Sequence, residues 1–96
     1  MITCREDSEW TIDLSEIDTR LELMLHNINR LEDPVAQRDL TKMYWNVYSI
    51  REEVSKEAVR CRNLNRTTGT MQRLQKSIES SVATVEQLLT LTMLMQ

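Results

Sequence analysis

A single heptad register runs through most of this chain and limits what it can fold into. From Leu40 to Thr92, mostly apolar residues recur at alternating steps of three and four, so the a and d positions continue for about eight heptads. This spacing places the apolar side chains along one stripe of an α-helix. No stretch shows the sustained apolar–polar alternation of a half-buried strand. The register therefore predicts an all-α, coiled-coil-forming protein.

Length and composition agree with this prediction. The chain has 96 residues, with one Gly, one Pro and no Phe, and it is rich in residues that favour helix. A chain of this length forms one domain at most. Residues 1–12 show no apolar period and carry several acidic side chains, which predicts a flexible acidic tail. Residues 13–96 are then a single helical coiled-coil domain.

The stripe formed by the a and d positions is called the seam. A shorter seam precedes the long one. It predicts a first helix over about residues 14–32, with Asp13 or Ser15 at its start, where their side chains can cap free backbone amides. Asp33-Pro34 interrupts the seam, and proline suits the first turn of a new helix with Asp33 as its cap. The apolar positions of the first helix are Leu14, Ile17, Leu21, Met24, Ile28 and Leu31.

The second helix is expected to run from about residue 35 to about residue 95, and its continuity is the open question. Residues 67–70 combine three threonines with the only glycine, Gly69, so a break there would give a three-helix bundle. Without a break the chain is a helical hairpin or an extended coiled coil, with a short first helix and a long second one. The heptad phase is the same on both sides of Gly69, which favours the continuous helix.

A continuous second helix requires a partner. The first helix covers a similar length of the second, up to roughly the mid-fifties, so the seam beyond Cys61 has nothing in its own chain to pack against. Glu57 and Gln75 occupy core positions, where they either specify register and partner or are tolerated irregularities. We expect the protein interface to comprise Cys61, Leu64, Met71, Leu74, Ile78, Val82, Val85, Leu88, Leu89 and Leu91, with Trp45 as an exposed aromatic anchor.

Residues with catalytic chemistry are sparse. His26 is the only histidine and falls on the outward face of the first helix, and one glycine cannot form a phosphate-binding loop. Cys4 and Cys61 lack metal-ligand spacing. These observations predict a non-enzyme with no catalytic residues, no metal, no cofactor and no small-molecule substrate.

Charge and hydropathy limit the classes of partner that the chain can bind and the cellular compartment expected for it. Residues 1–33 carry nine acids and three bases, whereas residues 59–96 carry five bases and two acids, a polarity that suits self-association or an acidic partner. The basic residues have no aromatic among them, so the pattern does not favour nucleic-acid binding. The chain shows no secretory signal and no membrane span, which predicts an intracellular protein, cytoplasmic or nuclear.

In architecture, the pattern resembles the short helical subunits of stable cytoplasmic assemblies. Such subunits occur in the spindle-and-kinetochore-associated complex and in the complexes that build lysosome-related organelles. The shared features are the seam from Ile17 to Leu31, the Pro34 boundary, and a long helix with Tyr44 near its start and Met-Gln-Arg-Leu-Gln-Lys at residues 71–76. The resemblance is one of architecture rather than of motif. It implies a scaffold or adaptor subunit.

The sequence leads to two main functional hypotheses. The first is a non-catalytic subunit that joins a hetero-oligomeric coiled coil, with a homodimer as the alternative assembly. The second is a small helical chaperone that holds a client's amphipathic helix.

Overall fold

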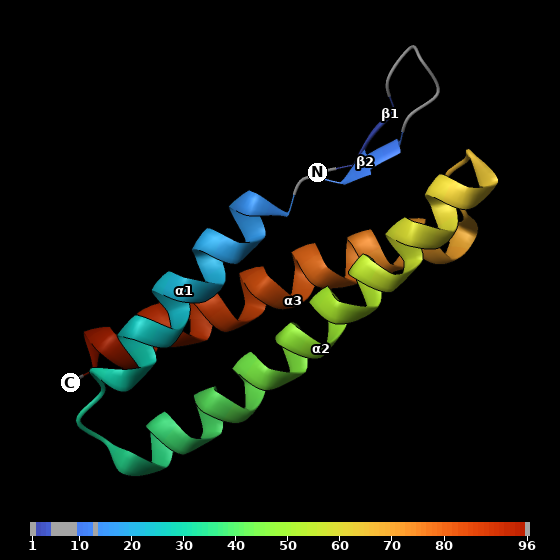
Figure 1. Ribbon diagram of the computed structural model, residues 1–96. Helices are drawn as coiled ribbons and strands as arrows, with labels where there is room; N and C mark the ends of the chain where they lie inside the picture. The colour runs from blue at the N-terminus through green and yellow to red at the C-terminus, as the bar shows by residue number, and fades with distance from the viewer. Residues whose placement is uncertain (1, 5–9, 13, 96) are drawn as a thin grey trace.

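The computed structural model describes residues 2–4, 10–12 and 14–95, which form a short strand pair and three helices. Helix α1 spans Ser15–Asn29, α2 spans Pro34–Leu64 and α3 spans Gly69–Leu94. Figure 1 shows α2 and α3 lying side by side as an antiparallel hairpin, with α1 packed along the half that contains the C-terminus. The prediction of an all-α protein is confirmed.

Helix α1 begins close to the predicted position but without the predicted cap. Leu14 occupies the N-cap position and no side chain caps the helix, while its carbonyl accepts a hydrogen bond of 2.8 Å from the backbone amide of Asp18. Ser15 is the first helical residue, and Asp13 lies outside the described residues. The helix ends at Asn29, three residues earlier than expected, and Leu31 remains buried in the turn that follows.

The boundary at Asp33-Pro34 is confirmed. Pro34 is the first residue of α2, and an Asp33 carboxylate oxygen accepts a hydrogen bond of 2.9 Å from the backbone amide of Val35. Proline fits here because the first helical position needs no amide donor. The Gln37 side chain donates to the backbone carbonyls of Ile28 and Asn29, which ties the end of α1 to the start of α2.

The second boundary corrects the preference for a continuous helix. Helix α2 ends at Leu64, and Asn65 adopts a left-handed conformation with φ of 54°, which reverses the chain. Thr68 then caps α3 by accepting a hydrogen bond of 3.0 Å from the backbone amide of Met71. Gly69 is the first residue of α3 rather than the point of reversal. The break at residues 65–68 yields the three-helix bundle.

The core is a single cluster along the inner faces of the three helices. Because the chain reverses at Asn65, α3 packs back onto α2 and buries the seam beyond Cys61 within the chain. The expectation that this seam has no partner of its own is therefore wrong. The buried apolar residues are Ile17, Leu21, Met24, Ile28, Leu31, Leu40, Tyr44, Val47, Val54, Cys61, Met71, Ile78, Val82, Val85 and Leu89.

The described N-terminal residues form a short antiparallel ladder. Strand β1 spans Ile2–Cys4, β2 spans Trp10–Ile12, and Ile2 pairs with Ile12. Strand β2 lies beside α2, near the end of the hairpin that α1 does not reach (Figure 1). The sequence predicted no regular structure for residues 1–12, so this pairing was missed. Residues 5–9 lie outside the described residues, and the flexibility of the segment stays a prediction.

Candidate protein-binding surfaces

The structure divides the predicted interface residues into two groups. Buried residues of the chain's own core cannot meet a partner without unfolding; these are Cys61, Met71, Ile78, Val82, Val85 and Leu89. Leu74 is partly buried and packs against that core. Four predicted residues remain exposed, with exposed fractions of 46% for Leu64, 38% for Leu88, 52% for Leu91 and 55% for Trp45. Candidate surfaces must be sought among these four and their neighbours.

One of the four, Leu88, lines a groove between α2 and α3. The groove has a volume of about 310 Å³. Met43 and Leu88 stand at its rim with exposed fractions of 37% and 38%. We call this surface the α2–α3 groove; it is lined by Met43, Asn46, Val47, Ile50, Ser80, Ser81, Thr84, Val85 and Leu88.

The groove and α1 lie on different sides of the α2–α3 hairpin, as the angular spacing of residues along each helix shows. Successive residues of an α-helix are about 100° apart. Arg51 faces α1 through its contact with Asp18, and Ile50 precedes it by one position, so Ile50 lies about a quarter-turn around α2. Glu86 faces α1 through Arg20, and Leu88 follows two positions later on the far side of α3. The groove therefore opens on a face of the hairpin that α1 does not cover.

A second apolar surface lies at the C-terminal end of the bundle. Leu94 and Met95 are 77% and 86% exposed, and the turn between α1 and α2 lies at the same end of the molecule (Figure 1). Met95 and Thr92 line a depression of about 590 Å³ together with Ala36 and the acidic residues Glu32 and Asp33. Apolar side chains beside carboxylates characterise this end.

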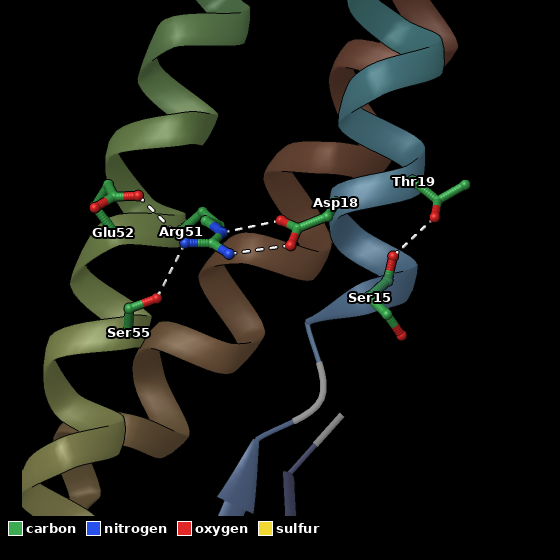
Figure 2. Close-up of polar contacts among 6 residues, drawn as sticks. All are labelled: Ser15, Asp18, Thr19, Arg51, Glu52 and Ser55. Carbon is green, nitrogen blue, oxygen red and sulfur yellow. Dashed lines mark hydrogen bonds and ion pairs between the residues drawn. The ribbon is translucent and has the colours of Figure 1, made fainter.

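Helix α1 is held to α2 by an ion pair that Figure 2 shows in detail. The guanidinium of Arg51 donates to both carboxylate oxygens of Asp18 over 2.9 and 3.0 Å. The same side chain also contacts Glu52 at 3.3 Å and Ser55 at 3.2 Å. The hydrogen bond to Asp18 is the main reason why the pKa of Arg51 is raised above its ordinary value. Because both partners are partly exposed, we expect the pair to contribute about 1 kcal/mol.

A second ion pair joins α1 to α3. Arg20 binds the Glu86 carboxylate through two nitrogens, with a distance of 3.0 Å from its Nε atom to Oε2. The hydrogen bond to Glu86 is the largest cause of a raised pKa at Arg20. Arg20 also lies 4.0 Å from Glu16 on its own helix. The two ion pairs fix the rotation of α1 on the hairpin, because they engage opposite flanks of the helix.

The polar residue Glu57 belongs to a network at the α2–α3 turn. The Thr68 hydroxyl donates to the Glu57 carboxylate over 2.6 Å, while the same oxygen caps Met71. Cys61 Sγ lies 3.8 Å from this hydroxyl, inside the buried part of the turn. Glu57 therefore stabilises the turn between the helices. Gln75, the other polar seam residue, is half-buried and lines a shallow depression along α3.

Three aromatic rings cluster on one side of α2. Tyr44 is buried, whereas Trp45 and Tyr48 are 55% and 38% exposed. The ring of Trp45 meets both tyrosines edge to face, with centroid distances of 5.1 Å to Tyr44 and 5.5 Å to Tyr48. Burial is the main cause of a raised pKa at Tyr44, followed by the charges of Tyr48, Asp18 and Glu22. Asp18 and Glu22, which contribute to this raised pKa, both belong to α1.

Within residues 2–4, 10–12 and 14–95, no group of three or more His, Cys, Asp or Glu side chains is placed to hold a metal ion. None of the helices in that part of the chain combines the length and apolarity needed to cross a membrane. Comparison with protein-family models, curated proteins and solved structures gives no match.

Proposed function

We propose that this chain is a non-catalytic subunit of a multiprotein assembly, a scaffold or adaptor that binds an amphipathic helix of a partner protein. The α2–α3 groove is the surface that would receive this helix. The observation that supports the proposal is an apolar groove left open on an otherwise buried seam. Most residues of the predicted interface are buried within the chain, so a hetero-oligomeric coiled coil would form through a partner helix in this groove.

The groove suits a helix by its shape and chemistry. An amphipathic helix binds a groove through apolar side chains that recur every three or four residues. Met43, Ile50 and Leu88 supply the apolar walls, and the short side chains of Ser81 and Thr84 let a neighbouring helix approach closely. Leu91 is 52% exposed and lies one turn beyond Leu88, so it extends the apolar surface toward the C-terminus.

A chaperone for a client helix is the second candidate, and exposed methionines favour it. Met43, Met93 and Met95 are 37%, 43% and 86% exposed. Methionine side chains are flexible and polarisable, so they adapt to clients of different sequence. A chaperone would exchange its client and bind several sequences, whereas a subunit would hold one partner in a fixed ratio.

Site-specific photo-crosslinking tests the proposal. A photoreactive amino acid replaces Thr84 inside the groove, and a matched variant carries it at the adjacent exposed Ala83, about 100° around the helix. In native cells we expect Thr84 to crosslink one partner in a fixed ratio and Ala83 not to do so. Many different products at Thr84 would support the chaperone instead. Equal crosslinking at both positions, or none, would contradict both functions.

A second pair of variants tests whether partner binding depends on the groove. Leu88→Lys places a charge at the groove rim, and Gln87→Lys places the same charge on a neighbouring exposed position. We expect Leu88→Lys to weaken partner binding about tenfold or more, because it desolvates a charge in an apolar contact. Gln87→Lys should bind normally. Both variants should keep the thermal stability of the wild type, so that lost binding is not lost folding.

A further inference from the structure

The aromatic cluster is flanked by carboxylates and lies on a different face from the α2–α3 groove. Asp18 of α1 binds Arg51 of α2, and Glu22 lies one turn further along the same side of α1. Glu52 follows Tyr48 by four residues, one turn along α2; its side chain contacts Arg51 at 3.3 Å and is 47% exposed. We call this surface, made by Trp45, Tyr48, Glu22 and Glu52, the aromatic–acidic patch.

The patch has the chemistry that recognises a cation. An arginine guanidinium stacks on the face of a tryptophan or tyrosine ring and forms hydrogen bonds with a nearby carboxylate at the same time. Trp45 is held by its two edge-to-face contacts, so its exposed surface is pre-organised. Glu22 makes no ion pair with another described residue. The patch therefore presents both an aromatic surface and an uncompensated negative charge.

The complementary surface lies on the same chain, at the turn between α2 and α3. Arg62 and Arg66 flank Asn65 at this turn, and both side chains are exposed. Arg60 and Arg73 lie one turn away on the two helices, and residues 59–76 contain no acidic residue. None of these arginines makes an ion pair with another described residue. We call this group of four arginines the basic tip.

We propose that the chain self-associates, with the basic tip of one copy docked on the aromatic–acidic patch of the next. The charge complementarity of the two surfaces supports a second copy as the occupant. The two surfaces lie at different places on the bundle, the tip at its end and the patch midway along α2. A single contact between the tip of one copy and the patch of the next leaves one tip and one patch free, so further copies can add to the chain. This proposal does not rest on the proposed function.

The size of the tip sets the strength of the contact. The bundle has principal extents of 50 × 19 × 15 Å, so its end offers a small docking area. Interfaces of this size fall at the weak end of the specific range. We expect dissociation constants of roughly 10 µM or weaker, and association that decreases steeply as salt screens the charges.

Sedimentation of the full chain over protein concentrations from ~10 µM to ~1 mM tests the proposal. We expect the wild type to form a growing series of oligomers at low salt and to be monomeric at ~1 M salt. Glu22→Arg in the patch, or Arg62→Glu with Arg66→Glu in the tip, should each weaken association about tenfold or more. Glu53→Arg is the matched control, because it makes the same charge change at an exposed position outside the patch.

Mixing the two variants gives the sharpest result. The patch variant retains a working tip and the tip variant retains a working patch, so together they should form a 1:1 dimer that cannot grow. A wild type that is monomeric at every concentration overturns the proposal. So does an equal loss of association in Glu53→Arg, or a mixture of the two variants that stays monomeric.

Two further measurements separate self-association from nucleic-acid binding at the tip and from helix binding in the groove. The first is binding of duplex DNA. If the wild type does not self-associate but binds duplex DNA in a salt-sensitive way, and the tip variant loses this binding, the basic tip is a nucleic-acid site and the self-association proposal is overturned. Leu88→Lys should leave self-association unchanged, and Glu22→Arg should leave crosslinking at Thr84 unchanged. The two proposals can therefore fail independently.

Discussion

Thr68 is the residue on which the turn between α2 and α3 depends most. Its hydroxyl caps α3 by accepting from the Met71 amide at 3.0 Å and donates to Glu57 at 2.6 Å, at a site only 8% exposed. Thr68→Val keeps the shape of the side chain and removes both hydrogen bonds. Loss of an N-cap costs about 1 kcal/mol. Loss of a donor to a partly buried carboxylate adds about 1 kcal/mol, so the expected total is roughly 2 kcal/mol.

Chemical denaturation measures this loss directly. We expect Thr68→Val to lower the free energy of unfolding by about 2 kcal/mol, with a decrease in melting temperature of roughly 10 °C for a domain of this size. Thr68→Ser is the matched control, because serine keeps the hydroxyl and caps helices equally well. Its stability should lie within about 1 kcal/mol of the wild type. A Thr68→Val protein as stable as the wild type would refute the assignment of Thr68 as the cap and anchor of the turn.

Three further outcomes follow from the structure. Asn65→Gly should retain full stability because glycine accepts the left-handed φ of 54°, whereas Asn65→Val should lose about 1–2 kcal/mol in denaturation. Leu89→Ala should lose about 2–5 kcal/mol because Leu89 is 4% exposed, whereas Leu88→Ala, at 38% exposed, should lose far less in the same assay. Burial raises the pKa of Tyr44, so its neutral form stabilises the fold fully below pH 10.0 and this contribution is lost as pH rises through the raised folded value. Stability measured above pH 10.0 should therefore decline less in Tyr44→Phe.

The sequence predicted the helices and most of the core because these depend on local pattern. The structure buries the seam of α1 from Ile17 to Leu31 and, along the long register, a positions of α2 and both a and d positions of α3, as far as Leu89. The Asp33-Pro34 boundary was also predictable, since a cap and a proline act within one turn. The ion pair between Asp18 and Arg51 was not, because 33 residues separate the partners and only the packed bundle brings them together.

The sequence favours a continuous helix through Gly69, and the structure shows the physical reason why this prediction is wrong. Cys61 and Thr68 are seven residues apart, and both are buried on either side of the turn, with their side chains 3.8 Å from each other. The turn thus occupies one heptad, and the a positions continue through it without a change of phase. A preserved register is therefore compatible with a reversal whenever core residues flank a turn of this length. The stronger local signal was the capping potential of Thr68, which determines where α3 begins.

This reversal also changes which residues can carry a protein-binding function. When α3 folds back onto α2, most seam positions become core, and the apolar residues that stay accessible lie at the edges of the seam, such as Met43 and Leu88. Helix α1 has 15 residues and covers one side of the hairpin. The α2–α3 groove lies on the face of the hairpin that α1 does not cover. A partner helix that binds there would pack on the hairpin from the side opposite α1, so both faces of the hairpin would then be covered.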